Sequence, residues 1–470
     1  MSVGRLHPSM DFGSVTQRSG IYQNQDIPVQ VPLVNPLTSA SQTLLLQVPP
    51  IVHNMSKSSL TLNYTIPNTS AVGLYFNTYE DLLGMEAFSS LTFGPAQGTY
   101  LCQLTNPALY AKIIPKLDVG LKQFMDNDDA TGFHLTNTAV ANANVVPVGY
   151  VVPANNSYNL AAGTNWSAAS YPQPNYVRTS GLVAVAGSII VSRTIPLGQL
   201  TGTLFALKHD QFFNTVMNLT LTTAPAANFC YTSTSAATGT AAAAGAAANI
   251  YAPSLFSVTL NLATQQDPKI VDDVKSWARS GGMRYQIPFL TTMSTPAPVG
   301  NNTVNVSLNS AYGQKLKRIV SVAQGVAAQT SATGFCPTDI SNYNGSKITY
   351  IGTTLAGTQL QKKSQNNCLL PLTTAVGNVL DDYREMKRFT IDTCLQDYQA
   401  YSYNWFWCDS FSEKSTTPAL QNDQIDEGIQ LGLGNSTYAM NMNAAVALNI
   451  WSFVETIRHV EIGSAGPVIV

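Results

Sequence analysis

The chain has 470 residues. This is longer than a domain with a single hydrophobic core usually is, and it is enough for two or three domains. Only 11% of the residues are charged, against about a quarter in typical soluble proteins, and the formal net charge is -2. The basic footprint of a nucleic-acid-binding protein is therefore missing. Thr, Ser, Asn and Gln carry the polar role instead. They suit surfaces that other proteins cover, because burying them costs less hydration and side-chain entropy than burying Lys or Glu.

No segment predicts targeting or membrane insertion. The longest apolar runs, at 183–191 and 444–454, fall short of the roughly 20 residues that a spanning helix needs. The first residues lack the apolar core of a signal peptide, so we expect synthesis in a cytosol. The widely spaced cysteines include no CxxC pair, which favours reduced structural thiols over disulfides or a metal site. They are Cys102, Cys230, Cys336, Cys368, Cys394 and Cys408.

Short strands are predicted from the start of the chain. Residues 1–25 are polar and aperiodic, which predicts an N-terminal arm. Alternating or turn-bounded apolar residues then predict strands at 26–34, 43–48 and 59–66.

A helix and two long excursions interrupt this pattern. In the segment 106–125, Asn106 can cap a helix that Pro115 ends or kinks. The weakly patterned stretches 127–177 and 224–249 are predicted to be long loops, which in compact domains are usually functional or externally exposed.

The stretch 181–223 is the most regular part of the first half. An apolar run at 182–191 leads through 195–198 into a strand at 216–221. Strict alternation in that strand predicts one buried face and one polar face. The polar face is a candidate contact surface and consists of Asn218, Thr220 and Thr222.

The second half repeats the same kinds of element. A strand at 256–262 leads into a helix that Asp267 caps and Pro268 begins. The apolar stripe of that helix is Ile270, Val271, Val274, Trp277 and Ala278, and Gly281-Gly282 stops it. Further strands are predicted at 283–293, 303–309, 315–324, 347–351, 358–360, 401–407, 428–433, 437–442, 446–454, 456–462 and 468–470, with a helix at 381–395. The order of elements indicates two β-rich domains of similar plan.

The sequence contains no coherent active site. Its five histidines are isolated from one another, and no HExxH, GxSxG, Walker or GxGxxG motif occurs. The segments that could carry chemistry have simpler interpretations as acidic turns, helix caps and strand. These are Asp126–Asp129, Asp381-Asp382, Asp423, Asp426-Glu427 and the lone Gly432-Leu433-Gly434. We therefore predict no enzyme, no catalytic residues, no cofactor and no metal.

An aromatic run, Tyr398 to Trp407, could form a sugar or base platform. On an alternating strand, however, it favours core packing on one face and subunit contact on the other.

Several segments, taken in order, resemble the double jelly-roll major capsid proteins of icosahedral DNA viruses, the lineage of tailless bacterial and archaeal viruses, virophages and large eukaryotic DNA viruses. They are Leu91 to Gly98, Ile195-Pro196-Leu197-Gly198 before a strand, 256–262 before the capped helix, and 303–308 followed by Lys317-Arg318-Ile319-Val320.

The resemblance implies an all-β protein with two side-by-side eight-stranded jelly rolls, at 26–297 and 298–470. It implies a pseudo-hexagonal homotrimer that tiles an icosahedral virion shell, with 127–177 and 224–249 projecting outward and the termini at the base. The implied partners are neighbouring trimers, minor capsid, penton or cement proteins, and an internal membrane or genome, without sequence-specific nucleic-acid binding. The location would be the virion, after synthesis in the host cytoplasm.

Two other classes fit less well. A small RNA virus capsid protein with one jelly roll and a projection commonly begins with a basic arm, which is weak here. A secreted adhesin or carbohydrate-binding protein, with the aromatic run at 398–407 as its site, would need a signal peptide.

Overall fold

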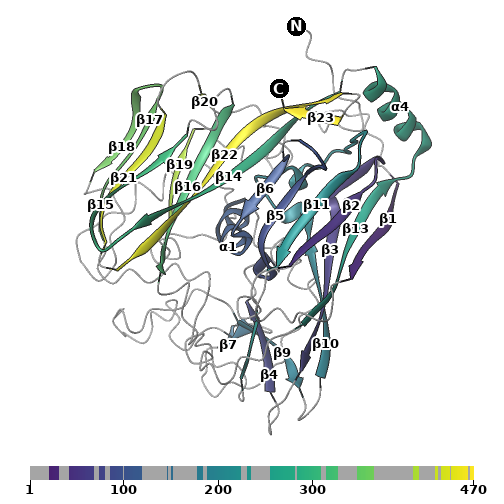
Figure 1. The fold of residues 1–470 in the computed structure, drawn as a ribbon, viewed down its shortest axis with the longest axis horizontal. Coiled ribbons are helices and arrows are strands. Elements are labelled where there is room, and N and C mark those ends of the chain that lie inside the picture. Colours follow the sequence, from purple (N-terminus) through teal and green to yellow (C-terminus); the bar gives the residue numbers. More distant parts are fainter. Residues whose placement is uncertain are drawn as a thin grey trace.

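Strands dominate the computed structural model (Figure 1). It describes residues 21–30, 42–67, 74–79, 85–98, 100–118, 145–146, 150–151, 177–183, 188–223, 230–233, 254–280, 283–308, 314–326, 347–364, 406–411, 429–431, 436–444, 446–463 and 466–469.

Two antiparallel sheets form the N-terminal roll. Their strand orders are β1-β13-β3-β10 and β2-β11-β5-β6. The strands are β1 (Tyr22–Gln30), β2 (Thr43–Val48), β3 (His53–Pro67), β5 (Phe88–Pro95), β6 (Cys102–Thr105), β10 (Ser188–Pro196), β11 (Met217–Thr223) and β13 (Ser254–Gln265).

Two further antiparallel sheets form the C-terminal roll. Their orders are β14-β22-β16-β19, with β20 and β23 at its margins, and β15-β21-β17-β18. The strands are β14 (Arg284–Ala297), β15 (Gly300–Ser307), β16 (Lys315–Gly325), β17 (Lys347–Leu355), β18 (Thr358–Ser364), β19 (Phe406–Ser410), β20 (Ile429–Gln430), β21 (Thr437–Ala444), β22 (Leu448–Gly463) and β23 (Gly466–Ile469).

The two rolls share one connectivity. Counted along the chain within each roll, leaving out β20 and β23, the first, eighth, third and sixth strands form one sheet. The second, seventh, fourth and fifth form the other. This is the strand order of a jelly roll, in which two sheets pack face to face. The predicted pair of eight-stranded jelly rolls is confirmed.

Alternation along the strands builds each core. In β11, Met217, Leu219 and Leu221 are buried while the residues between them are half-buried. The facing sheet contributes Leu60 and Leu260, which are also buried. Period-two burial on two facing sheets leaves one polar outer face on each.

A fifth sheet, of order β12-β4-β9-β8-β7, is built from three insertions into the N-terminal roll. Its strands are β4 (Leu74–Tyr79), β7 (Val145–Val146), β8 (Tyr150–Val151), β9 (Val177–Val183) and β12 (Cys230–Ser233). The sheet lies at the end of the molecule away from both termini (Figure 1). The predicted excursions 127–177 and 224–249 contribute strands to it, and their other residues lie outside the described part of the chain.

Two α-helices and three short 3-10 turns complete the described elements. They are α1 (Pro107–Asp118), α4 (Pro268–Arg279), η2 (Met85–Ala87), η4 (Leu197–Gln199) and η5 (Leu204–Ala206). The predicted cap of α4 is confirmed, because the Asp267 side chain accepts a hydrogen bond from Lys269 N at 3.0 Å. Pro115 does not end α1, which continues to Asp118.

Three sequence-based boundaries need correction. Strand β1 begins at Tyr22, inside the predicted arm, because its backbone pairs with β13. Strand β14 pairs with β22 along its whole length, so residues 284–297 belong to a C-terminal sheet and not to the first roll. The predicted strands 446–454 and 456–462 are one strand, β22. The predicted helix 381–395 lies outside the described residues.

Candidate functional site

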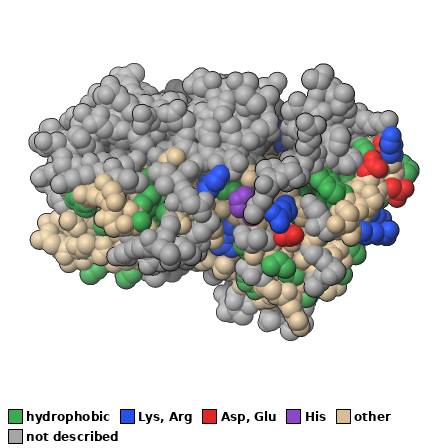
Figure 2. Space-filling model, turned by 90° about the horizontal axis from the view of Figure 1, so that it is seen from above, with side chains coloured by type: hydrophobic (Ala, Val, Ile, Leu, Met, Phe, Trp, Pro, Cys, Tyr) green, Lys and Arg blue, Asp and Glu red, His purple; other side chains and the backbone are tan. Residues whose placement is uncertain are grey.

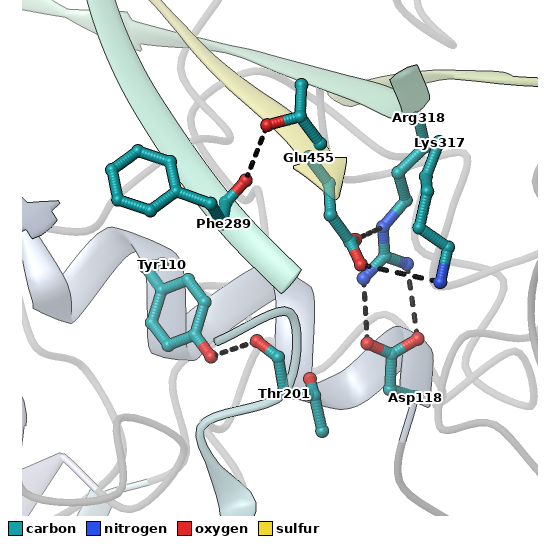
Figure 3. A network of polar contacts seen from close by, with 8 residues as sticks. Tyr110, Asp118, Thr201, Phe289, Lys317, Arg318 and Glu455 are labelled. Atoms are coloured by element: carbon teal, nitrogen blue, oxygen red, sulfur yellow. Dashed lines mark hydrogen bonds and ion pairs between the residues drawn. The ribbon is translucent and has the colours of Figure 1, made fainter. Parts of the chain in front are cut away.

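A buried ion-pair network joins the two rolls. Arg318 on β16 reaches the end of α1 in the N-terminal half (Figure 3). Its Nη1 and Nη2 donate to Asp118 Oδ1 and Oδ2 at 3.1 and 2.7 Å. Its Nε donates to Glu455 Oε2, on β22, at 2.5 Å. Lys317 Nζ lies 3.9 Å from Glu455 Oε1. One guanidinium thus holds carboxylates from both halves of the chain.

Close packing around this network excludes water from it. The Tyr110 ring of α1 lies edge-on to Phe453, with centroids 6.4 Å apart, and its hydroxyl donates to Thr201 O. Gly202 follows with a φ of +72°, and a Cβ there would lie 3.4 Å from Glu455 Oε2. Burial raises the pKa of Tyr110 well above its usual value, so its hydroxyl stays a donor.

The network orients the rolls more than it stabilises them. Desolvating charges offsets most of the attraction between them, so a buried ion pair adds little net free energy. The planar guanidinium of Arg318 can nevertheless donate two parallel hydrogen bonds to a carboxylate only over a narrow range of positions. Asp118 and Arg318, which is 1% exposed, are therefore fixed in one relative arrangement.

A second contact between the rolls lies at Tyr285 of β14. Its ring stacks on His209 of the N-terminal half, with centroids 6.0 Å apart and planes 10° apart. Its hydroxyl accepts a hydrogen bond from Phe212 N at 3.0 Å. With the Arg318 network, this contact makes the two rolls one unit.

Asp210 organises the N-terminal side of this contact. Its carboxylate accepts from Tyr22 Oη at 2.6 Å, from Asn54 Nδ2 at 3.1 Å and from Gln265 Nε2 at 2.8 Å. Tyr22 also lies under Lys57 Nζ, 3.8 Å from the ring centroid. These contacts fasten the edge strand β1 to the body of the roll.

The structure brings together two histidines that are far apart in sequence. His53 and His209 are both buried near Asp210, and burial lowers the pKa of each to about 4. The hydrogen bond to Ile51 partly offsets this shift in His53, and the Asp210 charge partly offsets it in both. His53 Nδ1 donates to Ile51 O at 2.8 Å, which fits a neutral imidazole. Sequence reasoning missed this cluster and the Arg318 network, because no local spacing marks either.

The outer sheet faces of the N-terminal roll are almost uncharged. On the sheet β2-β11-β5-β6, the predicted contact residues Asn218, Thr220 and Thr222 are half-buried and lie on the outer face. Leu45 lies beside Thr220 on the same face and is 45% exposed. In the view from above, the described surface is mainly uncharged, with charged side chains of both signs at the right, where α4 lies, and a second group near the middle (Figure 2).

The other sequence-predicted segments do not form a site among the described residues. Asp126–Asp129, Asp381-Asp382, Asp423, Asp426-Glu427 and Gly432–Gly434 lie outside them, as does the aromatic run before Phe406. Within the described ranges, no group of three or more His, Cys, Asp or Glu could hold a metal ion. No helix of the described part is long and apolar enough to span a bilayer.

No protein-family model and no curated protein sequence matches the chain. Its fold is similar to that of the Faustovirus major capsid protein, with a TM-score of 0.53 and 9% identity over 96% of this chain and 92% of that chain. It is equally similar to a chain of the Sputnik virophage structure, with a TM-score of 0.53 and 11% identity over 97% and 90%. At such identities the likeness is one of fold, and the fold is the double jelly roll.

Proposed function

We propose that the chain is a major capsid protein, which assembles with copies of itself into the shell of an icosahedral virus. The observation that carries this proposal is the pair of rolls with identical connectivity, held in one orientation by the Arg318 network. Because each chain has two equivalent rolls, three chains can place six similar rolls around one axis. The likeness to the Faustovirus major capsid protein, which extends over 96% of this chain, supports the same function.

The working unit in this proposal is a pseudo-hexagonal homotrimer. Its neighbours are other trimers and minor, penton or cement proteins, and its place is the virion. The end that carries both termini faces inward, toward a membrane or genome, and the fifth sheet faces outward. No catalytic residue and no cofactor is part of this function.

The rolls are also the proposed domains. We place the boundary between Ser280, where α4 ends, and Met283, because β14 pairs only with C-terminal strands. Two rolls of equal connectivity do not fit a single-jelly-roll RNA virus capsid protein.

Mass photometry of the purified full chain tests the proposal. We expect a dominant species of three times the 50.4 kDa chain mass, stable on dilution. A species that stays at 50.4 kDa across the concentration range would contradict the proposed function.

A further inference from the structure

Corresponding sheet faces of the two rolls differ in what covers them. Strands β16 and β22 of the C-terminal roll occupy the same places in the strand order as β3 and β13 of the N-terminal roll. The outer faces of these two sheets should therefore meet similar neighbours if the rolls stand in similar positions around an axis.

In the C-terminal roll this face is covered from within the chain. Val320 and Val322 of β16 and Phe453 of β22 are buried on it, beside Arg318 and Glu455. The covering elements belong to the N-terminal half. They are α1, through Tyr110 and Asp118, the turn at Gly202, and β6, which contacts β14.

In the N-terminal roll the matching face is only half-buried. It presents Ser59, Thr61 and Asn63 of β3 beside Thr259 and Asn261 of β13, with Thr194 of β10 next to Thr61. Nothing among the described elements covers it as α1 covers the other roll.

The side chains of this face are already ordered. Asn261 Nδ2 donates to Ser59 Oγ at 3.2 Å and to Thr61 Oγ1 at 2.8 Å, and Asn63 Nδ2 donates to Ser257 Oγ at 2.9 Å. Burying polar groups that are already hydrogen-bonded to one another costs less free energy than burying unpaired ones. Among the described side chains of these strands, the exposed charges are Asp26 on β1 and Lys57 on β3, which lies over the Tyr22 ring near the β1 edge. The residues Ser59, Thr61, Asn63, Thr259 and Asn261 therefore bring no charge that would need desolvation.

We propose that the outer face of the sheet β1-β13-β3-β10 binds a second copy of this chain, at the β18 edge of its C-terminal roll. Strand β18 is the fifth strand of its roll, as β6 is of the N-terminal roll. The contact between copies therefore repeats the contact within the chain and closes a ring of alternating rolls. This inference rests on the proposed function and names the surface that it uses.

Two pairs of arginine substitutions test the surface. Thr259→Arg with Thr194→Arg places two charges on the proposed face, and Thr92→Arg with Thr220→Arg places two charges on the outer face of the sheet β2-β11-β5-β6. All four threonines are half-buried. Mass photometry should show association of the first pair weakened on the order of 100-fold, because buried unpaired charges oppose binding. The second pair lies on the face that the sequence marked as a candidate contact surface, which the contact proposed here does not use, so it should associate as the wild type does. Thermal unfolding should show both variants folded.

The outcomes separate this inference from the proposed function. A wild-type trimer with an undisturbed Thr259→Arg/Thr194→Arg variant overturns the surface and leaves the capsid function standing. Equal dissociation of both variants overturns it too, because the effect would not be specific to the face. A monomeric wild type overturns both.

Cross-linking tests the occupant. A bismaleimide should join copies of the double variant Asn24→Cys/Gln359→Cys into a ladder that ends at three chains, because β18 should meet β1 of the next copy as β6 meets β14 within the chain. Neither single variant should form that ladder. A trimer without the cross-link contradicts β18 as the contacting strand.

Discussion

Arg318 is the residue on which the arrangement of the two rolls depends most. Substitution by Met keeps much of its volume but leaves the carboxylates of Asp118 and Glu455 buried without their cation. We expect a loss of about 3–5 kcal/mol of unfolding free energy, the usual cost of breaking a buried pair. Denaturant titration measures it.

Arg284 offers a matched control for Arg318. It also pairs with a glutamate across β14 and β22, Glu461 at 3.3 Å, but its side chain is 66% exposed. Arg284→Met should cost less than about 1 kcal/mol, because water screens the pair. Equal losses of unfolding free energy in the two variants would contradict the assignment of Arg318 as the centre of a buried ion-pair network that joins the rolls.

His53 and His209 make the stability of the protein depend on pH. The pKa of each is about 4 in the folded state and 6.5 in the unfolded state, so the unfolded state binds more protons between these values. Stability should therefore be complete above pH 6.5 and fall as the pH drops toward 4. The free energy of unfolding at several pH values measures this slope.

Single substitutions identify the source of that slope. His209→Phe keeps an aromatic ring against Tyr285 and should flatten the dependence between pH 6.5 and 4. The exposed His459, substituted in the same way, should leave the slope unchanged. An unchanged slope in His209→Phe would show that other groups govern the acid response.

Among the elements, edge strand β1 pairs with β13 along its length and is also fastened by the Tyr22 hydrogen bond to Asp210. Tyr22→Phe removes the hydrogen bond to Asp210, worth about 1.5–3 kcal/mol for a charged acceptor. Hydrogen exchange should then quicken in β1 and stay slow where β3 pairs with β13. Unaltered exchange in β1, with Tyr100→Phe as an exposed comparison, would show that strand pairing alone holds the edge.

Elements with local signals were predictable from sequence, and those defined by distant partners were not. Asp267, Pro268 and the apolar stripe locate α4, and alternation locates β11, because both signals lie within a few residues. Glu455, in contrast, looks like a polar break between two strands. Its partner Arg318 is distant in the sequence, and only the fold shows that β22 continues through it.

The same reasoning explains why the Arg318 ion-pair network was not predicted from the sequence. A charged residue in a strand predicts an exposed edge, unless a partner is known. Arg318 and Asp118 come from different rolls, so neither local spacing nor composition could pair them. The duplicated plan, by contrast, was visible in the order of elements.

At the scale of the whole molecule, two equivalent and rigidly joined rolls suit this chain to be the repeating unit of a closed shell, as proposed above. Cryo-electron microscopy of the purified, assembled protein tests it most directly. We predict particles with three chains and six rolls around a pseudo-sixfold axis, with the sheet β1-β13-β3-β10 of each chain covered by its neighbour. Particles that are monomers, or assemblies that leave this sheet facing solvent, would contradict the account.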